Sequence, residues 1–173
     1  SEYDAIVPGQ SFDLAVRFDL EEGGHIYWEN PGDSGLATVV DWALPENIVA
    51  GEIQWPAPER IQLGGLVNYG YEEEAVFIVT LQAPEDLKLG SELTITADLF
   101  WLICQEICLP GEVTLELVLP VAGNAEPSAE ATAFVEARNR QARTAHPWAT
   151  TTYLEEEALV VVIEGEALPS DLY

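Results

Sequence analysis

Two observations on the sequence predict an all-β fold. We expect an antiparallel β-sandwich of immunoglobulin type, followed by one helix and a short β tail. First, apolar residues alternate with polar ones over long stretches, which is the period of a half-buried strand. Second, clusters rich in glycine and proline interrupt these stretches at short intervals. Short alternating strands with frequent turns are typical of two packed antiparallel sheets.

Three segments carry the alternation most clearly. Apolar residues occupy every second position in each of them, and charged residues or threonine fill most of the positions between. These segments are residues 12–20, 93–101 and 113–119. Shorter β-rich runs are found at residues 25–28, 38–42 and 75–81. The turn clusters that separate the strands include residues 22–24, 30–33, 63–65 and 110–111.

The pattern changes after Pro120. Residues 127–143 predict a helix, because Pro127 suits a first helical turn and alanine recurs through the segment. Three arginines lie near the C-terminal end of this segment, where cations complement the helix dipole. They are Arg138, Arg140 and Arg143, half of the six basic residues of the chain.

A further strand is predicted at residues 158–163. We therefore expect three parts. Residues 1–122 form the immunoglobulin-like domain, residues 123–145 a loop and the helix, and residues 146–173 a β tail. This tail either packs on the first domain or begins a second one.

Charge and composition exclude several classes of function. The chain has 6 Lys and Arg against 31 Asp and Glu, a formal net charge of −25 at pH 7. Nucleic acids and anionic membrane surfaces attract clustered basic residues, so we expect neither as a partner. A hydrophobic content of 48% is too high for a disordered acidic tail.

No apolar run approaches the roughly 20 residues of a membrane-spanning helix, so we expect no direct membrane insertion of this segment. The chain begins at Ser1 and contains no methionine. We therefore expect a soluble piece of a larger secreted or membrane-tethered protein.

The only two cysteines, Cys104 and Cys108, form a C-x-x-x-C pair that has three interpretations. A metal site is disfavoured, because His25 and His146 are the only imidazoles and a closed zinc site needs four ligands. A structural disulfide across so few residues removes little chain entropy, so its stabilisation is modest. The third interpretation is a redox-active dithiol.

The strand register favours sulfur atoms that a partner can reach. If the strand from Leu93 continues through Ile103, Cys104 lies on the outward face, and extrapolation back from Val113 puts Cys108 there too. A tight hairpin brings the two Cβ atoms within disulfide distance. Exposed disulfides that close short loops are the labile kind.

Local charge argues against a low thiol pKa at this pair. Glu106 lies between the cysteines, Glu112 follows them, and the surrounding chain is acidic. Negative neighbours disfavour a thiolate and so raise the pKa of a thiol. We therefore expect the oxidised pair to be attacked by a partner's thiolate, and the reduced pair to need contact with its partner.

Three segments taken together resemble a known family. They are residues 25–35 (HIYWENPGDSG), residues 54–60 (QWPAPER) and residues 101–111 (WLICQEICLPG). In this order they resemble the N-terminal periplasmic domain, or disulfide bond corrector domain, of the DsbD/ScsB thiol:disulfide interchange proteins, with the ScsB-like branch the closer match. The resemblance spans most of residues 11–120. It implies an immunoglobulin-like fold in the periplasm, in the soluble part of an inner-membrane protein, without a cofactor.

The resemblance also implies an activity, a thiol:disulfide oxidoreductase with Cys104 and Cys108 as its redox pair. Cys108 forms the mixed disulfide with the partner and Cys104 resolves it. Electrons come from the transmembrane and thioredoxin-like domains of the same full-length protein and pass to thioredoxin-like periplasmic proteins. Better-known members shield the cysteines with a cap loop. The matching positions here, which we expect to form the cap and contact partners, are Asn68, Tyr69, Gly70 and Tyr71.

A different class of function remains as the alternative. It is a non-catalytic β-sandwich that binds a protein or a glycan and carries a structural disulfide. Two further motifs are set aside. The sequence of residues 32–35 matches the surroundings of a chymotrypsin-type serine, but its neighbours do not supply the catalytic roles. The glutamate runs at residues 72–74 and 155–157 lack the alternating spacing of a calcium loop.

Overall fold

The computed structural model describes residues 1–105, 107–141, 148–156 and 158–165. The chain divides into two compact units, Ser1–Ala142 and Arg143–Tyr173. Within its described part, the first unit holds strands β1 to β9 and helix α1. The strands are β1 (Ser11–Asp19), β2 (His25–Gly32), β3 (Val39–Ala43), β4 (Val49–Gln54), β5 (Glu59–Leu63), β6 (Leu66–Glu72), β7 (Glu74–Gln82), β8 (Glu92–Cys104) and β9 (Cys108–Pro120).

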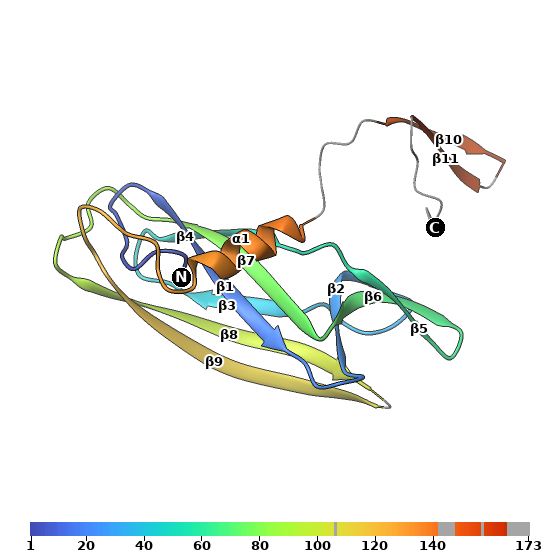
Figure 1. Ribbon diagram of the computed structural model, residues 1–173, viewed down its shortest axis with the longest axis horizontal. Helices are drawn as coiled ribbons and strands as arrows, with labels where there is room; N and C mark the ends of the chain where they lie inside the picture. The colour runs from blue at the N-terminus through green and yellow to red at the C-terminus, as the bar shows by residue number, and fades with distance from the viewer. Residues whose placement is uncertain (106, 142–147, 157, 166–173) are drawn as a thin grey trace. The chain divides into compact units, whose positions relative to one another are not determined.

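Two sheets form the body of this unit (Figure 1). The smaller sheet has the order β1-β7-β4, and the larger has the order β3-β8-β2-β6-β5 with β9 paired to β8. Apolar side chains of both sheets meet in one cluster, in which Leu14 and Val79 of the smaller sheet pack with Ile95 and Leu119 of the larger. The predicted all-β sandwich of immunoglobulin type is therefore confirmed.

The β8–β9 hairpin is the longest ladder of the fold. Its register runs without a break from Glu92 opposite Pro120 to Cys104 opposite Cys108. Odd-numbered residues of β8 face the sandwich core, and Ile95 and Leu99 are only 2% and 3% exposed. This arrangement confirms the alternation predicted for β8 and extends both strands to the cysteines. In β9 Leu119 is buried, whereas Val113 and Leu115 are 40% and 44% exposed.

Two tryptophans pack in the core, as expected from their strand-like surroundings. Trp42 of β3 and Trp101 of β8 pack against the buried Val16, Ala97 and Leu99. Indole rings in these positions fill the space between the sheets rather than forming an exposed aromatic platform.

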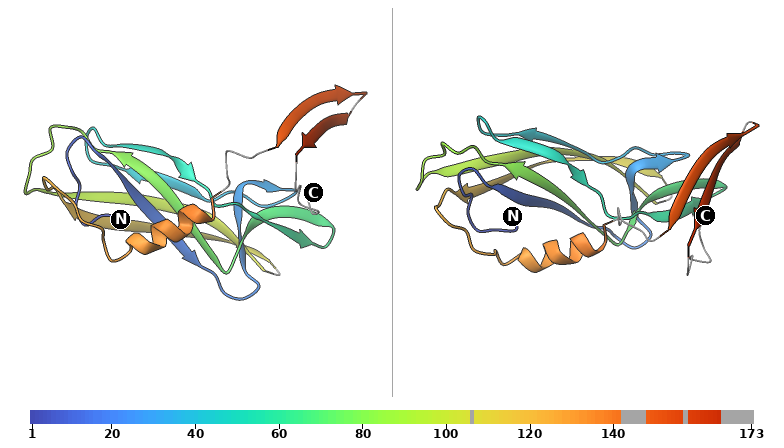
Figure 2. Two further views of the ribbon diagram at one scale, coloured as in Figure 1. Left: turned by 45° about the horizontal axis from the view of Figure 1, so that its top comes forward. Right: turned by 90° about the horizontal axis from the view of Figure 1, so that it is seen from above.

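Helix α1 (Ala131–Asn139) is shorter than the predicted helix over residues 127–143. Pro127 instead forms an isolated β-bridge with Tyr3, which keeps the preceding backbone extended. The helix lies outside the smaller sheet (Figure 2), where Phe134 and Ala137 cover Ile78 of β7. The last predicted helical residues, 142 and 143, fall outside the described residues.

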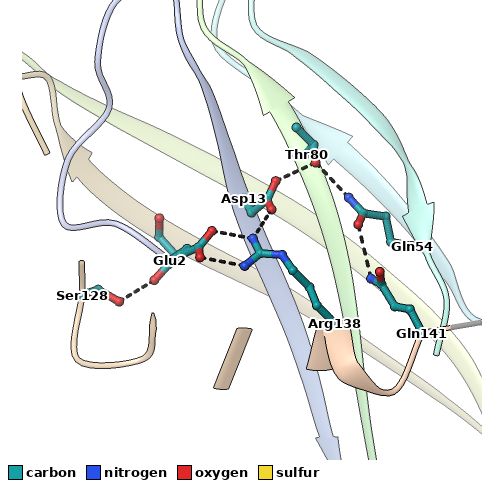
Figure 3. Close-up of polar contacts among 8 residues, drawn as sticks. Glu2, Asp13, Gln54, Thr80, Ser128, Arg138 and Gln141 are labelled. Atoms are coloured by element: carbon teal, nitrogen blue, oxygen red, sulfur yellow. Dashed lines mark hydrogen bonds and ion pairs between the residues drawn. The ribbon is translucent and has the colours of Figure 1, made fainter. Parts of the chain in front are cut away.

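Arg138 fastens the end of α1 to the sandwich (Figure 3). Its guanidinium donates to both carboxylate oxygens of Glu2, at 2.8 and 2.6 Å, and to Asp13 Oδ2 at 2.6 Å. The hydrogen bonds that Arg138 donates to Glu2, and then the one to Asp13, raise the pKa of Arg138. This side chain therefore serves an internal ion-pair network rather than an open basic surface.

The second unit contains a hairpin of β10 (Ala149–Glu155) and β11 (Ala158–Glu164). The strand predicted at residues 158–163 is confirmed, whereas its partner β10 was not predicted. His146 lies outside the described residues. The expected division of the chain after residues 122 and 145 stays a prediction, as does the start of a second domain at residue 146.

Candidate redox site

Cys104 and Cys108 are joined by a disulfide at the end of the β8–β9 ladder. They are the last cross-strand pair, with Cα atoms 4.0 Å apart, so the hairpin itself brings the two side chains together. Ile103 packs against the core on one face of β8. Cys104 therefore lies on the opposite face, as the register predicts, but it is buried there, so the expectation that a partner can reach both sulfur atoms is wrong for Cys104.

The two sulfur-bearing residues differ sharply in exposure. Cys104 is only 2% exposed, because β9 covers one side of it and His25 of β2 pairs with it on the other. Cys108 is exposed. An incoming thiolate can therefore reach Cys108 but not Cys104.

A tyrosine hydroxyl lies against the buried sulfur. The Tyr27 hydroxyl donates to Cys104 Sγ at 3.0 Å and lies 3.6 Å from Cys108 Sγ. A disulfide sulfur carries no proton, so the hydroxyl is the donor in this contact. Tyr27 is 1% exposed. Burial raises the pKa of Tyr27, which keeps the hydroxyl protonated, while a hydrogen bond with Ser34 acts in the opposite direction.

A buried histidine completes this group. His25 Nε2 lies 3.4 Å from the Tyr27 hydroxyl oxygen, and the two rings meet edge to face. The imidazole is 2% exposed. Burial lowers the pKa of His25, and the negative charge of Glu72, opposite it on β6, raises this pKa in part. The net direction is downward, so the ring is neutral near pH 7.

Two glycines let the backbone close around the Tyr27 ring. Gly35 has φ +91°, and a Cβ atom there would lie 2.3 Å from the Tyr27 ring. Gly70 of β6 stands opposite Tyr27, and a Cβ atom there would lie 2.1 Å from the carbonyl oxygen of Ile26. Any other residue at either place would push the strand or the loop away from Tyr27.

The segment at residues 32–35 has a structural role in this arrangement. Asp33 Oδ2 accepts a hydrogen bond from the Val67 amide at 2.8 Å. Asn68 Oδ1 accepts two more, from the amide of Ser34 at 3.0 Å and from its hydroxyl at 3.1 Å. These bonds tie the chain that follows β2 to β6, directly beside the ring of Tyr27.

The four residues expected in a cap loop lie in strand β6 instead, paired with β2 and β5. Asn68 and Gly70 lie on the face that carries Tyr27. Tyr69 and Tyr71 lie on the other face, where Tyr71 packs on Phe77 and Tyr69 contacts Trp28. The hydroxyl of Tyr71 donates to the Pro56 carbonyl at 2.9 Å, and burial raises the pKa of Tyr71. A partner-binding role for these residues stays a prediction.

Two exposed apolar residues flank Cys108 in the sequence. Ile107 is 69% exposed and Leu109 is 53% exposed, on either side of Cys108 in the sequence. Together with Ile103 they line a groove of about 630 Å³ beside the hairpin end. Gln105 closes this groove by donating to the Glu22 carbonyl at 3.0 Å.

Neither Tyr27 nor His25 was identified as functional from the sequence. Both occur in the segment His25–Trp28, whose alternation predicts only a strand. Their position beside Cys104 arises from the pairing of β2 with β8, and residue 27 is 77 positions from residue 104. The shared parity of residues 25 and 27 was the one available signal, since it places both side chains on the same face.

Fold and site together define a class of protein, an immunoglobulin-like domain that carries a disulfide with one exposed sulfur at the end of a β-hairpin. A family model described as "Thiol:disulfide interchange protein DsbD, N-terminal" matches residues 1–120. The chain belongs to this DsbD N-terminal family, as its sequence motifs indicated. Helix α1 and the hairpin of β10 and β11 lie outside the matched residues.

Solved structures include similar folds. The N-terminal periplasmic domain of ScsB from Proteus mirabilis matches with a TM-score of 0.72 at 20% identity, over 95% of this chain and 62% of that chain. The DsbD N-terminal domain of Neisseria meningitidis, in its reduced form, matches with a TM-score of 0.40 at 17% identity, over 66% of this chain and 81% of that chain. This chain thus spans about three fifths of the ScsB structure. A comparison with curated proteins found no match.

In the part of the chain that the structure describes, no helix combines the length and the apolar character needed to cross a membrane.

Proposed function

We propose that this chain is a periplasmic thiol–disulfide exchange module that relays electrons from a membrane-embedded reductase to periplasmic oxidoreductases. The reversible Cys104–Cys108 disulfide carries the electrons. One observation supports this function above the others. The disulfide combines an exposed sulfur, at Cys108, with a buried sulfur at Cys104 that receives a hydrogen bond of 3.0 Å from Tyr27.

Reduction of the module begins at the exposed sulfur. A thiolate of the reductant attacks Cys108 Sγ, a new S–S bond forms there, and the bond to Cys104 Sγ breaks. Cys104 leaves as a thiolate with the electron pair of the broken bond. A second thiolate of the reductant then attacks the reductant's own sulfur in the mixed disulfide. This step releases Cys108 as a thiolate, so the module gains two electrons and the reductant becomes a disulfide.

Delivery of the electrons reverses these steps. The Cys108 thiolate attacks a disulfide of the recipient, and Cys104 then attacks Cys108 Sγ to release the recipient as a dithiol. The difference in exposure supports these roles, because Cys108 is exposed and Cys104 is buried.

Tyr27 assists the breaking of the disulfide. Its hydroxyl points at the sulfur that becomes a thiolate, and a hydrogen bond to an ionised acceptor is stronger than one to a neutral acceptor. The bond therefore strengthens as the S–S bond breaks. A leaving thiol of lower pKa departs faster.

The partners that fit this site are thioredoxin-like proteins with a less acidic or basic face. They include thioredoxin-like periplasmic recipients and the transmembrane and thioredoxin-like domains of the same full-length protein. Ile107, the residue before Cys108, offers an exposed apolar side chain, and the net charge of −25 attracts a cationic surface. A partner contact at Asn68, Tyr69, Gly70 and Tyr71 stays a prediction, and it would have to use Tyr69, because Asn68, Gly70 and Tyr71 are buried.

A trapping experiment tests this function. In the variant Cys104→Ser, Cys108 has no resolving partner, so it should hold an oxidised thioredoxin-like protein as a stable mixed disulfide. The matched variant Cys108→Ser keeps only the buried cysteine and should trap at least about tenfold less, in line with the dependence of exchange on access.

Equilibration of the wild-type disulfide with glutathione gives an independent measurement. The proposal requires a potential well above about −300 mV, the region below which structural disulfides lie. A bond that resists glutathione and thioredoxin-like proteins until the chain unfolds would point instead to a non-catalytic binding module with a structural disulfide.

A further inference from the structure

The buried sulfur of Cys104 presents a problem of proton supply. When the disulfide opens, Cys104 becomes a thiolate inside a site that is 2% exposed, in a chain with a net charge of −25. Burial and negative surroundings both disfavour a thiolate, so a proton has to reach this sulfur. Bulk water has almost no direct access to it.

The structure contains a continuous path of polar groups that ends at this sulfur. Cys104 Sγ accepts from the Tyr27 hydroxyl at 3.0 Å, and the oxygen of that hydroxyl lies 3.4 Å from His25 Nε2. The three residues come from two neighbouring strands, with His25 and Cys104 as a cross-strand pair. All three side chains are at most 2% exposed.

The chemistry of the sulfur fixes the direction of these bonds in the oxidised state. A disulfide sulfur can only accept, so the single hydroxyl proton of Tyr27 points at Cys104. The hydroxyl oxygen then accepts from the imidazole, which requires the proton of neutral His25 to be on Nε2. In the reduced state the Cys104 thiol has a proton of its own and can donate to Tyr27. The hydroxyl of Tyr27 can then donate to His25 Nε2, which requires the imidazole proton to be on Nδ1.

We propose that His25, Tyr27 and Cys104 form a proton wire, and that His25 exchanges its Nε2–H tautomer for the Nδ1–H tautomer when the disulfide is reduced. This inference rests on the proposed exchange function and names the groups that supply its proton. In it, His25 is a positioning residue that acts on Cys104 through Tyr27.

The transfer balances in atoms and charge. One proton enters from the solvent side marked by the exposed Glu72, the cross-strand neighbour of His25, and reaches Nδ1 while the Nε2 proton moves to the oxygen of Tyr27. The hydroxyl proton of Tyr27 moves to Cys104 Sγ. The two electrons come from the thiolate of the reductant. The net result is a neutral Cys104 thiol, a neutral tyrosine and a neutral imidazole with its proton on the other nitrogen.

The surroundings of His25 suit this role. Within the described residues, the titratable groups that face it are Tyr27 on its own strand, Cys104 on β8 and Glu72 on β6. Burial lowers the pKa of His25, which keeps the ring neutral and able both to give and to accept a proton. Burial raises the pKa of Tyr27, so its hydroxyl keeps its proton near pH 7.

Nitrogen-15 NMR of the wild-type chain tests the tautomer change directly. The imidazole nitrogens of His25 are compared in the oxidised protein and in the protein reduced by a phosphine. We expect the Nε2–H tautomer in the first and the Nδ1–H tautomer in the second. A spectrum of His25→Gln assigns the His25 signals by their loss and so separates them from those of His146, the only other histidine. The same His25 tautomer in both states would overturn the proposal.

Kinetics give a second test with matched variants. The variants His25→Gln and Tyr27→Phe should each slow the reduction of the disulfide by dithiothreitol by about tenfold, the order expected for loss of one charge-assisted hydrogen bond. They should also lower the solvent deuterium isotope effect on that rate. Tyr3→Phe removes a hydroxyl far from the cysteines in sequence and should leave both unchanged. An isotope effect that is the same in all variants would contradict the wire.

These readouts separate the wire from the function on which it rests. Both tests use chemical reductants and no protein partner. If the tautomer change occurs and no thioredoxin-like protein exchanges with the disulfide, the proposed function fails. If exchange occurs and the tautomer does not change, the wire alone fails.

Discussion

The hydroxyl of Tyr27 donates to the sulfur of Cys104 across 3.0 Å, although the two residues are 77 positions apart in the sequence. The contact links a side chain of β2 to the buried half of the disulfide. It gives the two cysteines different chemical surroundings, because Cys108 faces solvent and Cys104 faces a hydrogen-bond donor. Most of the expected behaviour of the site follows from this difference.

Removal of the Tyr27 hydroxyl should raise the pKa of the Cys104 thiol. A hydrogen bond that stabilises the thiolate lowers this pKa, so Tyr27→Phe should increase it. Thiolate absorbance against pH, recorded in a Cys108→Ala background, measures the shift. An unchanged or lower pKa in the Phe variant would mean that the hydroxyl does not stabilise the thiolate.

The two thiols of the reduced protein should differ in their rate of alkylation. Cys108 is exposed and Cys104 is buried, so we expect Cys108 to react with iodoacetamide at least about tenfold faster. Single-cysteine variants separate the two rates. The midpoint for Cys108 against pH should lie at or above that of a free thiol, about 8.5, because the chain is acidic. A midpoint well below this value would contradict the proposed electrostatics.

The variant Gly35→Ala should destabilise the domain and disturb Tyr27. At this position φ is +91° and the new Cβ would meet the tyrosine ring at 2.3 Å. We expect a loss of about 2–4 kcal/mol, which combines backbone strain with overpacking. Gly64→Ala is the matched control. Its φ is also positive, at +56°, but nothing lies within 4 Å of the added atom.

Urea unfolding of both glycine variants gives the two free energies. The free energy of unfolding of the Gly64→Ala control should fall only by the cost of backbone strain, about 1–2 kcal/mol. Equal losses in the two variants would show that contact with the Tyr27 ring does not constrain residue 35.

The stability of the domain should depend on His25 in mildly acidic solution. The pKa of His25 is lowered in the folded state, so the unfolded chain binds the additional proton first as pH falls. The contribution of neutral His25 to the free energy of unfolding is therefore complete above about pH 6.5. It is lost as the pH falls below this value.

The difference in unfolding free energy between wild type and His25→Gln isolates this contribution from that of the many carboxylates. We expect this difference to change between about pH 7 and pH 5, with the wild type losing stability relative to the variant. A difference that is constant over this range would rule out a lowered pKa.

Exchange with a cationic thioredoxin-like protein should become slower as salt is added. The net charge of −25 attracts such a partner over distances comparable to the Debye length, which is about 10 Å at 0.1 M salt. Stopped-flow rates at several salt concentrations measure the effect. Reduction by dithiothreitol serves as the control, because its reactive thiolate is an anion and added salt should not slow its approach.

Local alternation predicted much of the fold. The β8 and β9 segments were recognised because leucine, isoleucine and valine at every second position can bury only one face of a strand. The same period placed Cys104 and Cys108 on the outward face. Helix α1 was predicted too long, because Pro127 is compatible both with a first helical turn and with the extended bridge that it forms with Tyr3.

The candidate site was predicted only in part, because strand pairing is a non-local property. The two cysteines lie close together in the sequence, so a hairpin was enough to join them. His25 and Tyr27 reach Cys104 only through the pairing of β2 with β8, which no local pattern encodes. The residues expected in a loop, such as Tyr69, lie in β6 because that segment pairs with strands on both sides.

The position of the disulfide at the last step of the β8–β9 ladder affects how much the molecule must rearrange during electron transfer. Below the cysteines, backbone pairing continues unbroken down to Glu92 and Pro120. The backbone of the hairpin therefore keeps the two cysteine residues side by side independently of the bond between their sulfur atoms. We expect an opened pair to stay aligned for closure, so that little of the chain has to move between the two redox states.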